Sequence, residues 1–284
     1  MERALKPSEN EPPCKTRISG EHVDFTVKGE AGGGAKLLQD VNFKINENMF
    51  TGLIGPNGSG KTTLLKTVYR IYKPSRGAVY LDGDNVHSLK PRLAAQKMAV
   101  LAQEQRVVFD FPVIEIVLMS RHAQKNFFET DGRGGLAVCE EALRQFGLYE
   151  MRERSFLSLS GGEKQRALLA AAFAQGTGII ILDEPANHLD IGQQLLIMDM
   201  IKKRPRTTVF ASIHDLNLAA RYCDRIIAIK SGRIIASGIP EEILTVNLIR
   251  ELFQVEARIE REVETGCLHI RYIRGIGGVH SANG

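Results

Sequence analysis

The sequence predicts an α/β fold with a mostly parallel sheet, an N-terminal antiparallel β layer and an inserted helical subdomain. Between residues 160 and 230, short apolar runs alternate with stretches of helical spacing, which is typical of a parallel sheet covered by helices on both faces. The region from 18 to 45 instead alternates apolar and polar positions, which predicts antiparallel strands. Residues from about 104 to 158 show helical spacing and are expected to form the insertion.

The two N-terminal strands are expected at Ile18–Val27 and Leu37–Ile45, where apolar residues such as Val23 and Phe25 alternate with polar ones. The glycine-rich segment Gly29–Ala35 between them predicts a flexible turn. Three further elements are expected in order: a buried strand at Phe50–Ile54, a helix at Thr62–Tyr72 and a strand at Gly77–Leu81.

The rest of the chain continues the pattern. Two helices of the insertion are expected at Val113–Met119 and Leu136–Phe146. The helices expected after it are Glu163–Ala174, Gln193–Lys203 and Leu216–Cys223, and the expected strands are Ile179–Leu182, Thr207–Ser212 and Arg225–Ile229. We expect one domain over residues 18–274, a disordered leader at 1–17 and a flexible tail at 275–284.

The composition argues against several classes of function. The net charge of +4 is only mildly basic, so no nucleic-acid partner is expected. The four cysteines show no C-x-x-C spacing and the histidines no H-x-x-x-H pattern, so a zinc site has little support. No apolar run approaches the roughly 20 residues of a membrane-spanning helix, and the N-terminus lacks the apolar region of a secretory signal. Any membrane association is therefore expected to come through a partner.

A phosphate-binding loop is the strongest motif. Gly55–Thr62 reads G-P-N-G-S-G-K-T, between a predicted strand and a predicted helix, and this context indicates a P-loop NTPase core. Its backbone N–H groups are expected to face a phosphate, with Lys61 at the β- and γ-phosphates and Thr62 on Mg²⁺. The expected ATP contacts are Gly55, Pro56, Asn57, Gly58, Ser59, Gly60, Lys61, Thr62 and Thr63. No N-K-x-D motif occurs, which argues against a GTPase.

Two acidic residues end the apolar run I-I-I-L-D-E-P at 179–185. Asp183 is placed to hold Mg²⁺, and Glu184 is a candidate general base for the attacking water. The alternative is that the two carboxylates begin a helix or lie in a solvated loop. Beside a phosphate-binding loop, the catalytic interpretation is favoured.

A second anion-binding helix start is predicted at L-S-G-G-E-K-Q-R, residues 159–166. Ser160 and Glu163 also fit a capping box, and both interpretations can hold together. One chain has little use for two such sites on the same nucleotide. A head-to-tail homodimer can use both, because each copy contributes one of them to each nucleotide. We expect each ATP to lie between the loop of one copy and Ser160, Gly161 and Gly162 of the other.

Two isolated residues complete the expected site. His214 lies just past the strand Thr207–Ser212, at the sheet edge where ligands of α/β proteins bind, and is expected to contact the γ-phosphate. A structural role is the alternative for a lone histidine. Gln103 follows a short apolar stretch at the start of the insertion and carries no signal by itself.

Together these motifs resemble the nucleotide-binding subunits of ABC transporters, over roughly residues 18–260. Residues 55–62 resemble the Walker A loop, Gln103 the Q-loop, Leu159–Glu163 the signature motif, Ile179–Glu184 Walker B, Asn187–Asp190 the D-loop and His214 the switch histidine. The resemblance implies ATP and Mg²⁺ as cofactors, a rotated dimer, and ATP hydrolysis coupled to a transmembrane permease. It also implies Gln103 as a nucleotide and metal contact and Asp190 as a nucleotide contact.

A closer similarity is to the ATPases of iron–siderophore, haem and vitamin B12 importers. It rests on D-F-P-V-I-E-I-V at 110–117, N-H-L-D at 187–190, H-D-L-N-L-A-A-R-Y-C-D at 214–224 and G-I-P-E-E-I-L-T at 238–245. It implies a peripheral subunit on the cytoplasmic face of the cell membrane, working with a permease and, indirectly, an extracytoplasmic substrate-binding protein. We expect the segment Phe109–Arg121 to contact the permease, although its apolar residues could equally fill the core of the insertion.

Two residues depart from the family pattern. Ala186 stands where threonine often follows the proline, and Val27 stands where an aromatic residue often stacks on adenine. Val27 therefore predicts weak base selectivity, unless the glycine-rich turn lets Phe25 reach the base.

The main alternative function is a soluble ABC-type ATPase of DNA repair or translation. Such proteins are often tandem or carry long coiled-coil insertions, whereas this chain has one set of motifs and a short insertion. An inactive regulatory module conflicts with the intact Lys61, Asp183, Glu184 and His214. The transported substrate is not encoded here, because it is recognised by the permease and the binding protein.

Overall fold

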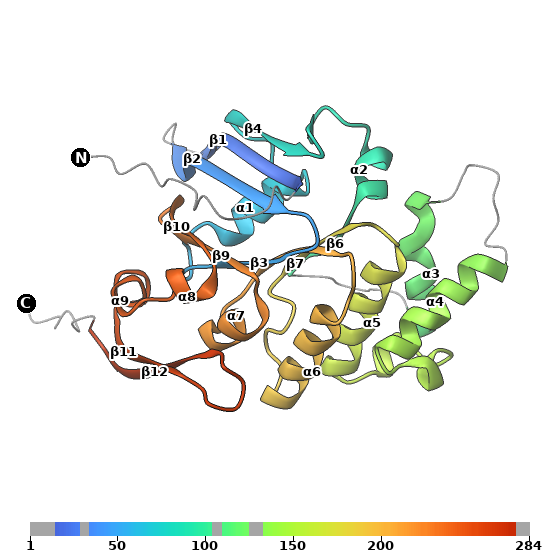
Figure 1. The fold of residues 1–284 in the computed structure, drawn as a ribbon. Helices are drawn as coiled ribbons and strands as arrows, with labels where there is room; N and C mark the ends of the chain where they lie inside the picture. Colours follow the sequence, from blue (N-terminus) through green and yellow to red (C-terminus); the bar gives the residue numbers. More distant parts are fainter. Residues whose placement is uncertain (1–14, 29–33, 104–109, 125–132, 277–284) are drawn as a thin grey trace, which may run out of the picture.

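The computed structural model describes residues 15–28, 34–103, 110–124 and 133–276, and its centre is a sheet of six strands (Figure 1). Their spatial order is β10 (Arg233–Gly238), β9 (Arg225–Lys230), β3 (Phe50–Ile54), β8 (Thr208–Ser212), β7 (Ile179–Asp183) and β6 (Met98–Leu101). All neighbours pair in parallel except β10 and β9. The predicted α/β class with a mostly parallel sheet is confirmed.

A second sheet forms the antiparallel layer at the top of Figure 1, in the order β2 (Gly34–Asn46), β1 (Thr16–Lys28), β4 (Arg76–Leu81) and β5 (Asp84–Asn85). Val23 pairs with Val41 and Ile18 with Leu81, so their buried side chains enter one core. The turn expected at 29–35 ends earlier than predicted, because Gly34 and Ala35 already belong to β2. Residues 29–33 lie outside the described residues.

The helices cover both faces of the central sheet. They are α1 (Lys61–Val68), α2 (Pro91–Lys97), α3 (Val113–Ser120), α4 (Arg133–Gln145), α5 (Gly161–Ala174), α6 (Ile191–Lys202), α7 (Leu216–Tyr222), α8 (Pro240–Ile243) and α9 (Val246–Phe253). Three short 3₁₀ turns lie at Arg121–Gln124, Tyr149–Met151 and Phe156–Ser158. A two-stranded hairpin, β11 (Val255–Arg261) and β12 (Leu268–Gly275), follows α9 and packs against α7.

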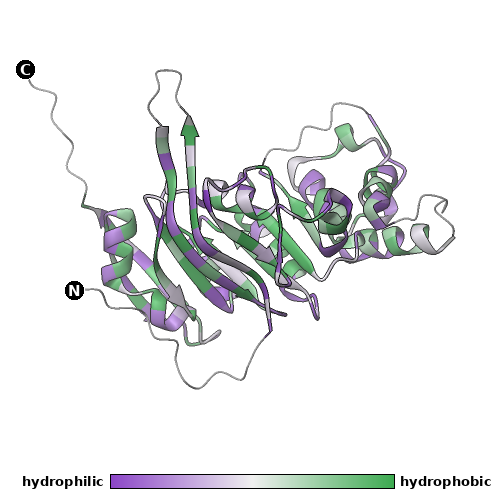
Figure 2. Cartoon of the chain, turned by 90° about the horizontal axis from the view of Figure 1, so that it is seen from above, coloured by the Kyte–Doolittle hydropathy of each residue, from purple (hydrophilic) through white to green (hydrophobic). Residues whose placement is uncertain are grey.

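Alternate residues of the central strands enter two different cores. On β7, Ile179 and Ile181 join the core shared with α1 and the antiparallel layer, whereas Ile180 and Leu182 join the core beneath α3 to α7. Figure 2 shows the hydrophobic residues concentrated on strands at the centre of the molecule. Because both faces are covered, the strands are apolar runs rather than alternating ones.

The structure shortens one expected helix, starts α4, α5 and α6 two or three residues earlier than expected, and adds elements that the sequence did not predict. The expected helix Thr62–Tyr72 ends at Val68, because Tyr69 caps it and Arg70 has a left-handed backbone with φ of +70°. The stretch before Gln103 is the edge strand β6, preceded by α2. The elements after β9 were also not predicted. Helix α5 begins after residue 158, where the expected insertion ends. It packs against both α3 and α4 of the inserted region.

The two sheets are joined by an aromatic contact whose removal should be costly. The rings of Phe43 on β2 and Phe210 on β8 stack with centroids 6.0 Å apart, and Phe210 is fully buried. We expect Phe210→Ala to lower the free energy of unfolding by about 3–5 kcal/mol in urea titrations. Ile71→Ala, at a site that is 64% exposed, is the control and should change it by less than about 0.5 kcal/mol. Equal effects of both substitutions would show that the two layers do not share a core.

Candidate active site

An open cleft of about 530 Å³ lies beyond the carboxyl ends of β3, β7 and β8. This is the edge of a parallel sheet where α/β proteins bind ligands. The cleft is lined by Leu37, Asn57, Gly58, Ser59, Gly60, Lys61, Thr62, Thr63, Gln103, Glu184, Asn187, His188 and His214. The sequence motifs around 55–63, 103, 184 and 214 therefore meet at one place.

The phosphate-binding loop runs from β3 into α1 and depends on glycine. A Cβ on Gly55 would lie 2.2 Å from the carbonyl oxygen of Ile229, and Gly60, the N-cap of α1, has φ of +107°. Lys61 is 5% exposed, and its Nζ donates to the carbonyl oxygens of Gly55 at 2.8 Å and Pro56 at 3.0 Å. Burial lowers the pKa of Lys61, while the charges of two nearby acidic residues raise it. A phosphate would give this ammonium a charge-assisted partner that neutral carbonyls do not supply.

Asp183 ends β7 next to the phosphate-binding loop. Its Oδ1 accepts hydrogen bonds from Ser212 Oγ at 2.7 Å and from Thr62 Oγ1 at 3.3 Å. Its Oδ2 is buried and has no hydrogen-bond partner among the described residues. Burial raises the pKa of Asp183, an effect that the two hydroxyl hydrogen bonds partly offset. A hydroxyl and a carboxylate with a spare oxygen fit the oxygen ligands that Mg²⁺ prefers.

Glu184 follows Asp183 with a left-handed backbone, φ of +54°. Its N–H donates to Ser212 Oγ at 2.8 Å, which helps to hold this uncommon conformation. Its Oε2 accepts hydrogen bonds from Gln103 Nε2 at 3.0 Å and from Asn187 Nδ2 at 2.7 Å. Two amides thus orient the carboxylate, and in this structure Gln103 contacts Glu184.

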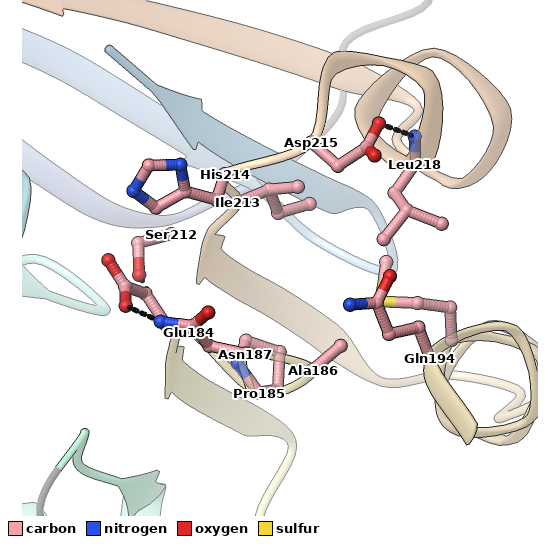
Figure 3. Close-up of a pocket in the computed structure, with 11 residues that line it drawn as sticks. Glu184, Pro185, Ala186, Asn187, Gln194, Ser212, Ile213, His214, Asp215 and Leu218 are labelled. Carbon is pink, nitrogen blue, oxygen red and sulfur yellow. Dashed lines mark hydrogen bonds between the residues drawn. The ribbon is translucent and has the colours of Figure 1, made fainter. Parts of the chain in front are cut away.

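His214 lies on the loop after β8, and its Nε2 is 2.8 Å from Asn57 Oδ1. Figure 3 shows the ring of His214 facing the Glu184 side chain from the neighbouring strand end. The figure also shows a small pocket next to the cleft, which is about 80 Å³ in volume. Ala186, the residue that departs from the family pattern, lines this pocket.

Two residues of the site were assigned no role from the sequence alone. Ser212 holds both acidic residues, and the available signal was a polar residue ending an apolar strand. Asn187, which the sequence placed only within a motif at 187–190, orients Glu184.

The second predicted anion site does not line this cleft. Ser160 caps α5, its Oγ accepts from the N–H of Glu163, and the Glu163 carboxylate accepts from the N–H of Ser160, so the capping box is confirmed. Asp190 likewise caps α6. The starts of α5 and α6 lie side by side, because a Cβ on Gly162 would stand 2.8 Å from Oε1 of Gln193. Nucleotide contact by Ser160, Gly161, Gly162 and Asp190 stays a prediction.

The two candidates for base stacking differ in their surroundings. Val27 is 44% exposed and pairs with Ala35 between β1 and β2. The ring of Phe25 is stacked on Tyr72 with centroids 4.7 Å apart. This stack gives Phe25 a structural role, and contact between either residue and a base stays a prediction.

Comparison with known proteins places these features in one family. The family model described as ABC transporter matches residues 38–187. The chain is 36% identical over 251 residues to the cobalamin import ATP-binding protein of Halobacterium salinarum, covering 87% of this chain and 63% of that protein's length. It is 37% identical over 236 residues to the iron(3+)-hydroxamate import ATP-binding protein of Bacillus subtilis, covering 82% and 88%. A dimeric ATP-binding cassette solved with ADP and Pi has a TM-score of 0.69 and 28% identity, covering 78% and 98%.

The raised pKa of Asp183 predicts a gain in stability when its charge is removed. A buried carboxyl whose pKa lies above its ordinary value of 3.8 destabilises the folded state as pH rises through the folded pKa. Without ligands at pH 7, Asp183→Asn should raise the melting temperature, by roughly 2–4 °C for each 1 kcal/mol. The gain should shrink as pH falls toward 3.8, and the exposed control Glu153→Gln should show none. With ATP and Mg²⁺ added, wild type should gain more stability than Asp183→Asn. A lower melting temperature for the ligand-free variant at pH 7 would contradict this interpretation.

Proposed function

Since the chain belongs to the ABC transporter family, we propose that it is the ATP-hydrolysing subunit of an importer for an iron–siderophore, haem or cobalamin-type substrate. The observation that carries the proposal is the convergence of Lys61, Asp183, Glu184 and His214 at one sheet edge. Relatives named for cobalamin import and for iron(3+)-hydroxamate import are 36% and 37% identical, so identity does not separate these substrates. Members of the family hydrolyse ATP coupled to transport.

The charged and polar side chains around the cleft can be given roles in ATP hydrolysis. Lys61 would leave the loop carbonyls for the β- and γ-phosphates of ATP. Thr62 and Asp183, with Gln103 at the rim, would hold Mg²⁺, which when bound neutralises charge on the phosphates. Glu184 Oε2 would take the proton of the attacking water, with its orientation set by Asn187. His214, on the loop after β8, would contact the γ-phosphate.

The residues outside the cleft support a dimer of two copies. Ser160 and Asp190 begin neighbouring helices, and exposed apolar side chains accompany them: Leu157 is 45% and Ile191 75% exposed. A second copy turned head to tail would cover these side chains and bring its α5 N-terminus to the ATP. The similar cassette bound to ADP and Pi is dimeric, which supports a dimer of this chain.

The permease is proposed to dock near the end of α3. Within the segment Phe109–Arg121, Phe109 lies outside the described residues and Val113 is fully buried, whereas the apolar side chain of Met119 is 43% exposed. A groove of about 560 Å³ begins beside it. It is lined by Tyr69, Arg70, Pro91, Ala94, Ala95, Met98, Val100, Ser120, Leu168, Ala172 and Gln175.

The described part of the chain contains no helix both long and apolar enough to cross a bilayer. From the similarity to import ATP-binding proteins, we place the subunit at the cytoplasmic face of the membrane, bound to permease subunits that receive cargo from an extracytoplasmic binding protein. Mg²⁺ is proposed as the metal that accompanies ATP.

Glu184→Gln is the direct test of the proposed chemistry. The amide keeps the shape of the side chain but cannot accept the proton of water, so kcat for ATP hydrolysis should fall by about 10²–10⁴. ATP binding should persist, and the ATP-bound protein should accumulate as a dimer in size-exclusion chromatography. Glu153→Gln, a charge-matched change on the exposed surface, should hydrolyse ATP like wild type. Turnover close to wild type in Glu184→Gln would remove the general-base assignment.

Base selectivity tests the expected role of Val27. Valine offers adenine a small apolar contact, so ATP and GTP should bind with similar affinity. Val27→Tyr should add about 0.5–1.5 kcal/mol of stacking, roughly a 2- to 12-fold gain in affinity for ATP. Phe25→Ala should lower stability through its lost stack on Tyr72 while leaving ATP affinity unchanged. If Phe25→Ala weakens ATP binding and Val27→Tyr does not strengthen it, Phe25 is the stacking residue.

A further inference from the structure

The helix that follows His214 is tied to the C-terminal hairpin by one side chain. Asn217, in the first turn of α7, accepts a hydrogen bond at Oδ1 from the N–H of Ile270 at 2.7 Å. Its Nδ2 donates to the carbonyl oxygen of the same residue at 3.3 Å. The amide therefore pairs with β12 as a neighbouring strand would, and it satisfies both backbone groups of Ile270. Ile270 is 2% exposed, so this anchor lies against the core.

The turn that leads into α7 carries both His214 and Asp215, the N-cap of this helix. Asp215 accepts hydrogen bonds from the N–H groups of Asn217 at 2.7 Å and Leu218 at 3.2 Å. Figure 3 shows Asp215 over the start of α7, next to the exposed ring of His214. Four consecutive residues thus contain the imidazole that faces Glu184, the cap of α7 and the anchor to β12. His214 directly precedes the cap Asp215 and lies three residues before the anchor Asn217.

Tyr272 provides a second contact between the hairpin and this turn. The pKa of the Tyr272 phenol is raised, first by partial burial and then by the nearby Asp215 carboxylate, while the backbone of Leu216 lowers it, although the residue is 51% exposed. Tyr272 and His214 also line a second cleft of about 650 Å³. His214 and Asn57 line both clefts, and their hydrogen bond lies between the ATP cleft and the hairpin.

We propose that Asn217 is a positioning residue for His214, through which the C-terminal hairpin β11–β12 acts on ATP hydrolysis. The inference rests on the proposed function, because the position of His214 matters only if the cleft hydrolyses ATP. An exposed catalytic side chain is placed by its backbone, and a displacement of about 1 Å can cost on the order of 10²-fold in rate. Loosening the anchor therefore impairs turnover more than ATP binding.

A double-substitution cycle on the full chain tests the proposal. Steady-state ATP hydrolysis is measured for wild type, Asn217→Ala, His214→Ala and the double variant. Asn217→Ala should lower kcat about tenfold with KM for ATP changed by less than about twofold, and should cost nothing further in the His214→Ala background. Asn217→Asp keeps the acceptor for the Ile270 N–H but loses the donor, so its kcat should be intermediate.

A matched control separates positioning from stability of the hairpin. Arg274→Ala removes the exposed ion pair with Glu256 between β11 and β12, at 2.8 Å, and should leave kcat unchanged. Thermal melting of each variant establishes that it is folded. If wild type hydrolyses no ATP, the proposed function fails and this inference falls with it. If wild type is active, an unchanged kcat in Asn217→Ala, losses that multiply with His214→Ala, or an equal loss in Arg274→Ala would each overturn the inference alone.

Discussion

The hydroxyl of Ser212 is the interaction on which the geometry of the site depends. It donates to Oδ1 of Asp183 and accepts from the N–H of Glu184, so one buried group holds both acidic residues. The parallel register of β7 and β8 places Asp183 opposite Ser212, and this register is set by apolar runs that fill two cores. The sheet therefore determines where the carboxylates lie, and the left-handed backbone of Glu184 turns the second one into the cleft.

The cleft is maintained at some cost to the folded state. Burial shifts the pKa of Lys61 downward and that of Asp183 upward, so in both cases the charged form is disfavoured. Oδ2 of Asp183 adds an acceptor that the described residues leave unsatisfied. A ligand that brings phosphate oxygens and a divalent cation would compensate both groups together. Such local costs are common where a protein keeps a site ready for a ligand.

The sequence predicted most of the core and of the cleft, because those signals are local. The phosphate-binding loop is a continuous motif, and the capping box at Ser160 needs only residues three apart. The edge strand β6 has four residues, too few for a periodic pattern, and Arg70 ended α1 early through its own backbone conformation. The anchor between Asn217 and Ile270 joins residues 53 apart in the chain, so only the folded structure reveals it. The proposed nucleotide contacts of Ser160 and Asp190 would depend on a second copy, so one folded chain does not test them.

The hydrogen bonds that Lys61 makes inside its own loop have a consequence for selectivity among anions. An arriving anion must replace two carbonyl oxygens, at 2.8 and 3.0 Å, that are already in place and already oriented. A single chloride or sulfate ion could contact the loop and the helix N-terminus, but it would leave the Thr62–Asp183 side of the cleft unfilled. A polyphosphate that carries a divalent cation would reach the ammonium and the helix N-terminus with its oxygens and the Asp183 carboxylate with its cation, so these gains add against one exchange of the Lys61 hydrogen bonds. The hydrogen bonds of Lys61 would therefore favour a polyphosphate with its cation over simple salts.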